Sequence, residues 1–153
     1  MDITLTHEPT RMIAQHRRIV ATSDLTSFYD SAYSAVITTL AAAGITPTGP
    51  AIGWYAGMPD DKADVAAAFP VARQTVGPLA DDVDIVELDG GRAITAEYQG
   101  AYEGLPDAWA ALESWRVAAD LAPRGDFWEE YLTDPSPGGD ARLNRTRLVL
   151  PVL

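Results

Sequence analysis

The chain has 153 residues and a mass of 16.4 kDa, which suits a single domain that buries roughly two-thirds of its surface. Its 11 Lys and Arg residues stand against 22 Asp and Glu residues, and the resulting net charge of −11 disfavours nucleic acid and anionic membranes as partners. Because cysteine is absent, disulfides, thiolate nucleophiles and thiolate zinc sites are excluded, and we expect a cytoplasmic protein.

The first half of the chain is predicted to hold four strands and one helix. Period-two alternation and β-branched residues place the strands at residues 2–6, 11–21, 51–57 and 64–73. From Asp24 to Ala43, apolar residues recur every three or four positions, which predicts a helix with one apolar face. Gly44 and Pro47 end this helix, because glycine adopts the left-handed backbone and proline cannot continue the hydrogen bonding.

The second half repeats the same order of elements. The predicted strands lie at residues 83–88, 92–100, 127–132 and 144–151. A second amphipathic helix is predicted from Leu105 to Leu121, with Pro106 tolerated in its first turn. Pro123 and Gly125 follow it and prevent its continuation.

A short sequence repeat links the two halves. Residues 49–55, after the first helix, resemble residues 125–131, after the second helix, and equivalent positions are 76 residues apart. We therefore predict an α+β fold for a single domain, residues 1–153. It consists of two β-β-α-β-β modules, about residues 1–76 and 77–153, with antiparallel sheets and one long helix each, related by a pseudo-twofold axis.

Negative charge is concentrated in the second module, which also carries a carboxylate among aromatic residues. Residues 1–76 have a net charge of −2 and residues 77–153 a net charge of −9. Because side chains alternate along a strand, Phe127, Glu129 and Tyr131 share one face. Burying a carboxylate without a partner is costly, so Glu129 either pairs with an arginine as a structural residue or faces a ligand. The residue pattern leaves both alternatives open.

No other pattern in the sequence indicates a catalytic or cofactor site. The two histidines, His7 and His16, would lie on opposite faces of a connecting strand, and residues 81–84 lack the spacing of a calcium loop. Phosphate-binding loops, dinucleotide fingerprints and nucleophile elbows are absent from the sequence. We therefore expect neither a metal nor a cofactor.

A series of short motifs runs in order along almost the entire chain. They are Gly49-Pro50, residues 52–55, Phe69-Pro70-Val71, residues 90–93, residues 99–105, Ala108-Trp109, Trp115, residues 128–132, Asp134-Pro135, Thr146 and Leu150-Pro151. As an ordered set they resemble the GyrI-like or AraC-type effector-binding domains, which include the ligand-binding halves of multidrug-sensing transcription regulators. The fold of that family, two modules about a pseudo-twofold axis, agrees with the repeat described above.

The resemblance also implies a ligand site. In this family the ligand binds in a central cleft between the modules, with aromatic walls and a glutamate that faces the ligand's positive charge. By motif position that glutamate is Glu129. The expected aromatic ligand-binding residues are Tyr55, Tyr102, Trp109, Phe127 and Tyr131.

The leading hypothesis is a stand-alone protein that binds lipophilic, cationic aromatic small molecules. No helix-turn-helix segment accompanies the motifs, so we expect no direct nucleic-acid binding. The net charge of −11 likewise leads us to expect no membrane partner. A second hypothesis is a metal-independent hydrolase of cyclopropane-bearing or other electrophilic xenobiotics, in which Glu129 activates water and Tyr131 or Tyr55 donates a hydrogen bond. A third is protein interaction of the gyrase-inhibitor kind. The first two hypotheses need the same residues, so residue types do not separate them.

Overall fold

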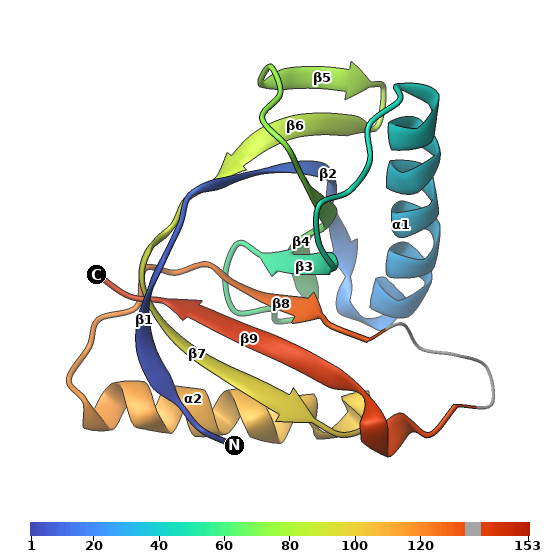
Figure 1. Cartoon of the computed structure of the whole chain (residues 1–153). Helices are drawn as coiled ribbons and strands as arrows, with labels where there is room; N and C mark the ends of the chain where they lie inside the picture. Colours follow the sequence, from blue (N-terminus) through green and yellow to red (C-terminus); the bar gives the residue numbers. More distant parts are fainter. Residues whose placement is uncertain (134–138) are drawn as a thin grey trace.

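An antiparallel nine-stranded sheet and two long helices make up the computed structural model, which describes residues 1–133 and 139–153 (Figure 1). The Asp134-Pro135 motif lies outside the described residues. The strands are β1 (Thr4–Glu8), β2 (Arg11–Ala21), β3 (Ala51–Tyr55), β4 (Lys62–Val71), β5 (Gly77–Ala80), β6 (Val83–Leu88), β7 (Gly91–Gln99), β8 (Phe127–Tyr131) and β9 (Arg145–Pro151). The helices are α1 (Leu25–Ala42) and α2 (Leu105–Ala118), preceded by the 3-10 turns Thr22–Asp24 and Tyr102–Gly104. The predicted α+β fold class is confirmed.

The strand order is symmetric about the central β3–β8 pair. Across the sheet the order is β1-β7-β9-β8-β3-β4-β2-β6-β5. Exchanging β1 with β6, β2 with β7, β3 with β8 and β4 with β9 gives the same order of these eight strands, read from the opposite edge of the sheet. The same exchange carries α1 onto α2 in the chain order. A pseudo-twofold axis between β3 and β8 would produce this arrangement.

The register of the central pair locates this axis at one pair of residues. Gly53 lies opposite Glu129, and these two residues are also 76 positions apart in the sequence. They are therefore equivalent in the repeat and paired in the sheet, which is possible only at the axis itself. Tyr55 and Tyr131 are equivalent in the same way and lie on either side of it.

Both helices cover one face of the sheet, α1 next to β2 and β4, and α2 next to β7 (Figure 1). Four side chains of α1 are buried at intervals of four residues: Phe28, Ala32, Val36 and Leu40. In α2 the corresponding buried residues are Ala108 and Leu112, which pack on Ile94 and Leu148 of the sheet. Burial of these apolar stripes fixes the two helices on either side of the axis.

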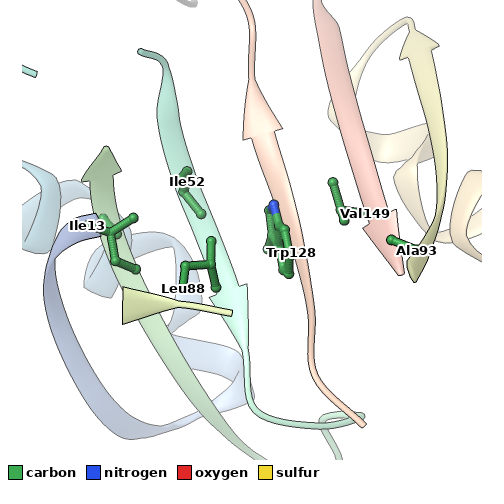
Figure 2. Close-up of a cluster of buried hydrophobic side chains, with 7 residues drawn as sticks. Ile13, Ile52, Leu88, Ala93, Trp128 and Val149 are labelled. Atoms are coloured by element: carbon green, nitrogen blue, oxygen red, sulfur yellow. The ribbon is translucent and has the colours of Figure 1, made fainter. Parts of the chain in front are cut away.

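A separate apolar cluster lies on the opposite face of the sheet. It includes Ile13, Ile52, Leu88, Ala93, Trp128 and Val149 (Figure 2). Next to it the β1–β2 connection crosses the β6–β7 connection at Gly90, whose N–H donates to Thr10 Oγ1 over 2.9 Å. A Cβ atom at Gly90 would lie 2.0 Å from the carbonyl oxygen of Glu8, so only glycine fits this crossing.

The eight predicted strands and both predicted helices are present, with small shifts of their ends. Gly44 ends α1 with the expected left-handed backbone (φ 71°). The sequence did not predict β5, because a four-residue strand that begins Gly77-Pro78 combines two residues that are disfavoured in strands. The prediction for α2 was three residues too long, since the chain turns at Asp120, which has a φ of 56°.

Neither α1 nor α2 combines the length and the apolar character that a bilayer span requires, and no other α-helix occurs among the described residues.

Candidate functional site

Glu129 is a buried carboxylate that is held by two uncharged donors. Its side chain lies on the helix-covered face of the sheet and is 7% exposed. The Tyr131 hydroxyl donates to Oε1 over 2.7 Å, and the indole Nε1–H of Trp109, from α2, donates to Oε2 over 2.8 Å. Among the described residues, no lysine or arginine forms an ion pair with it. Within the described residues, Glu129 is therefore not the structural partner of an arginine, which was one of the two alternatives left open by the sequence.

This environment raises the pKa of Glu129 above the ordinary carboxyl value. Burial is the largest cause, because desolvation penalises the charged form. The hydrogen bonds from Trp109 and Tyr131 stabilise the carboxylate and offset part of this penalty. A proton or a positively charged ligand would each relieve the remaining cost.

Aromatic rings surround the carboxylate, and they include every aromatic residue that the sequence analysis assigned to the site. Tyr55 stacks on Phe127 with ring centroids 5.0 Å apart, and Trp109 meets the same Phe127 edge-on at 4.9 Å. The ring of Tyr102 lies edge-on to that of Tyr131, at 5.9 Å. All five rings are half-buried, so each keeps some surface open to a ligand. The central cleft itself stays a prediction.

Helix α1 adds two tyrosines that the sequence analysis did not assign to the site. Tyr33 packs edge-on against Tyr131 at 6.5 Å and donates to the carbonyl oxygen of Ile52 over 2.7 Å. Tyr29 stacks on Tyr33 at 5.7 Å, and its buried hydroxyl lies next to that of Tyr55. Helical periodicity placed both in the apolar stripe of α1. The internal repeat could have indicated Tyr29. Tyr29 is the fifth residue of α1, and Trp109, which was assigned to the site, is the fifth residue of α2.

The tyrosines around Glu129 remain protonated at neutral pH. Burial, followed by the charge of Glu129, raises the pKa of Tyr55 to about 12. Burial likewise raises the pKa values of Tyr29, Tyr33 and Tyr131 well above the ordinary tyrosine value. Their hydroxyls therefore act as uncharged hydrogen-bonding groups, and they supply no positive charge to balance the carboxylate.

Gly53 makes room for this arrangement from the neighbouring strand. A Cβ atom at this position would lie 2.7 Å from the Tyr131 hydroxyl oxygen and 3.3 Å from that of Tyr29. The missing side chain thus leaves space for both hydroxyls directly opposite Glu129.

The neighbouring carboxylate, Glu130, has a different role on the opposite face of the sheet. It is 5% exposed, and its Oε2 atom lies 2.8 Å from Arg147 Nη1 and 2.9 Å from Arg11 Nη2. The indole Nε1–H of Trp128 donates to the same oxygen over 3.1 Å. Glu130 is therefore neutralised within the fold, whereas Glu129 is not.

The part of the chain that the structure describes contains no group of three or more His, Asp or Glu side chains arranged to hold a metal ion. His16 stacks on Phe28 with ring centroids 5.7 Å apart, and its Nδ1 lies 2.7 Å from the carbonyl oxygen of Asp82. His7 belongs to another strand, β1. Neither histidine contributes to the site around Glu129.

One protein family matches the chain over its whole length. A family model described as the GyrI-like small molecule binding domain matches residues 1–153. No curated protein sequence matches the chain at a significant level.

Solved structures share the fold at low sequence identity. EcmrR in a complex with DNA superimposes with a TM-score of 0.85 and 19% identity over 99% of this chain, which spans 57% of that chain. The separate C-terminal domain of EcmrR gives a TM-score of 0.83 at 18% identity, with 99% of this chain and 97% of that domain covered.

Two further structures cover nearly all of both chains. SAV2435 bound to tetraphenylphosphonium has a TM-score of 0.73 and 14% identity over 100% of this chain and 94% of its own. A hydrolase from Listeria innocua has a TM-score of 0.67 and 14% identity over 99% of this chain and 91% of its own. At these identities the likeness establishes the fold.

Proposed function

The chain belongs to the family of GyrI-like small-molecule-binding domains, and we propose that its ligands are lipophilic aromatic cations bound against Glu129. One observation carries this proposal: a buried carboxylate, surrounded by half-buried aromatic rings, has two neutral donors and no cation as partner among the described residues. A cationic ligand supplies the missing positive charge at that position.

Aromatic rings suit the same ligand class. Each ring that faces a cation contributes about 0.5–2 kcal/mol through its negative face, and planar rings also bury apolar ligand area. The ligand-bound relative SAV2435 supports this proposal, because tetraphenylphosphonium is a lipophilic aromatic cation. The acidic second module would in addition raise the local concentration of cations.

The proposal is tested by fluorescence titration with tetraphenylphosphonium and with a neutral aromatic compound of similar rings, triphenylphosphine oxide. Replacing Glu129 with Gln keeps the hydrogen-bond acceptor but removes the charge. We expect Glu129→Gln to weaken the binding of tetraphenylphosphonium by at least about tenfold, or 1.4 kcal/mol, and to leave the binding of the neutral compound nearly unaffected. Equal losses for both compounds would remove Glu129 from the proposed role.

A matched variant separates local contact from general attraction. Glu103 is an exposed carboxylate in the turn that precedes α2. Glu103→Gln makes the same change in net charge as Glu129→Gln, and we expect it to change phosphonium affinity only slightly because exposed charges are screened by solvent.

A second candidate function is hydrolysis of an electrophilic small molecule, and the raised pKa of Glu129 favours it. The carboxylate would accept a proton from water while the water oxygen bonds to the electrophilic carbon. The bond that breaks would leave its electron pair on the substrate, hydrogen-bonded by Tyr55. Tyr131 is less suited to donate this hydrogen bond to the substrate, since its hydroxyl already donates to Glu129.

Mass spectrometry after incubation with a cyclopropane-bearing electrophile tests the second candidate. A hydrated product that exceeds the Glu129→Gln background would support it, and no excess would reject it. The phosphonium titration is independent of this result, so the two functions are judged separately.

A further inference from the structure

The site around Glu129 holds a single unpaired negative charge among the described residues. Glu129 is 7% exposed, and its two hydrogen-bond donors, Trp109 and Tyr131, are uncharged. The position equivalent to Glu129 in the first module is Gly53, which lies directly opposite it in the sheet and has no side chain. The repeat therefore supplies one carboxylate at a place where it could have supplied two.

The other acidic side chains around the site do not add to this buried charge. Glu130 lies on the opposite face of the sheet and is paired with Arg11 and Arg147. The acidic residues of the two helices and of the turns before them are all solvent-exposed: Asp24, Asp30, Glu103, Asp107 and Glu113. Water and salt screen such charges, so they cannot balance a charge that is buried beside Glu129.

The tyrosines around Glu129 are uncharged as well. Burial raises the pKa values of Tyr29, Tyr33, Tyr55 and Tyr131 above the ordinary tyrosine value, and all four keep their protons at neutral pH. Their hydroxyls can form hydrogen bonds with a ligand, but they provide no second negative charge.

The N-terminal ends of both helices contribute to the same balance. Tyr29 and Trp109 each occupy the fifth position of their helix, so both lie toward its N-terminal end. A helix carries a partial positive charge at that end. The helices therefore supply no counter-charge for a second cationic group beside Glu129.

We propose that the site selects ligands with one positive charge, and that it discriminates against rigid aromatic dications as well as against neutral compounds of the same shape. This inference rests on the proposed function, because it takes Glu129 as the group that contacts the cation. A monocation neutralises the site, whereas a neutral compound leaves the carboxylate unpaired. A rigid dication would bury one positive charge without a counter-ion, and the aromatic faces return less than this desolvation costs.

The net charge of the protein predicts a different order of affinities. At −11, the field of the whole molecule attracts a dication more strongly than a monocation of the same shape. A preference for the monocation therefore cannot come from general attraction, and it would report the single carboxylate of the site.

Three compounds that share one two-ring skeleton test the proposal: neutral 4,4′-bipyridine, the monocation N-methyl-4,4′-bipyridinium and the dication N,N′-dimethyl-4,4′-bipyridinium. Each is titrated into the intact chain at slightly alkaline pH and followed by ¹H–¹⁵N NMR. The indole N–H of Trp109, which donates to Glu129, reports the site, and that of Trp54, which donates to Asp126, reports a place away from it. We expect the monocation to shift the Trp109 signal and to bind at least about tenfold more tightly than either of the other compounds.

Glu129→Gln removes the charge, and we expect the preference for the monocation over the neutral compound to disappear in this variant. Glu103→Gln makes the same change in net charge at an exposed position and should keep the order of affinities of the unaltered protein. The indole signals of both variants show in the same spectra whether each variant is folded.

A dication that binds as tightly as the monocation would overturn this inference and leave the proposed function intact. A neutral compound that binds as tightly as the monocation would instead contradict the proposed function, so the two failures are distinguishable. A preference for the monocation that persists in Glu129→Gln would assign it to another group and would also overturn the inference.

Discussion

Gly53 faces Glu129 across the β3–β8 pair, at the pseudo-twofold axis of the sheet. A perfectly symmetric repeat would place the same residue at both positions. Two glutamates there would bring two buried carboxylates together, and their mutual repulsion would be added to the desolvation cost. With glycine on one strand, the symmetric fold holds one carboxylate and has room beside it for the hydroxyls of Tyr29 and Tyr131.

Gly53→Ala is expected to disturb the site from the neighbouring strand. The new Cβ atom would lie 2.7 Å from the Tyr131 hydroxyl oxygen, so Tyr131 must move away from Glu129. We expect a loss of about 1–3 kcal/mol in the free energy of unfolding, typical of overpacking, and weaker binding of tetraphenylphosphonium. Urea unfolding and fluorescence titration measure the two effects.

Gly57→Ala is the control for that change, because nothing lies within 4 Å of a Cβ atom at Gly57. It should leave both the unfolding midpoint and the phosphonium affinity nearly unchanged. If Gly53→Ala behaved like Gly57→Ala, the close packing of Tyr131 over Gly53 would not matter for the site.

Stability should depend on pH through Glu129 in a direction opposite to that of most carboxylates. Burial raises its pKa in the folded state, so the folded protein holds this proton to higher pH than the unfolded chain does. Its contribution to the free energy of unfolding therefore falls as pH rises from the ordinary carboxyl range through the raised pKa. Glu129→Gln should remove this dependence and unfold at higher urea concentration than the unaltered protein at neutral pH.

The measurement is urea unfolding at several pH values for both proteins, with Glu103→Gln as an exposed control. The gap between Glu129→Gln and the unaltered protein should close as pH falls below the ordinary carboxyl range. Phosphonium binding by the unaltered protein should strengthen over the same rise in pH, because the cation binds the ionised carboxylate. Stability curves that run parallel at all pH values would contradict a raised pKa at Glu129.

Glu130→Gln should affect stability without affecting ligand binding. Removing its charge leaves Arg11 and Arg147 without their shared carboxylate, although Arg147 keeps Glu8 at 2.7 Å. Because both arginines are 29% exposed, we expect a cost of about 2–3 kcal/mol, below that of breaking a fully buried pair. Phosphonium titration of the folded variant should match that of the unaltered protein. Weaker phosphonium binding at unchanged stability would reverse the roles assigned to Glu129 and Glu130.

The sequence predicted the elements and the central carboxylate because both depend on local patterns. Alternation along one strand was enough to separate Glu129 from Glu130. Tyr29 was missed because helical spacing shows only that a side chain faces the interior. Whether such a side chain belongs to the apolar core or to the site around Glu129 depends on which residues of the sheet it faces.

Gly90→Ala should be among the most destabilising single substitutions outside the site. A Cβ atom there would lie 2.0 Å from the Glu8 carbonyl oxygen and 2.5 Å from the Pro9 carbonyl carbon, and backbone atoms cannot move aside as a side chain can. The β1–β2 and β6–β7 connections would have to move apart at this point, which would strain β1 and β2 next to the crossing. We expect a loss of at least about 3 kcal/mol, at the upper end for overpacking, measured by urea unfolding. Gly57→Ala again serves as the control, and a loss below about 1 kcal/mol would show that the crossing relaxes easily.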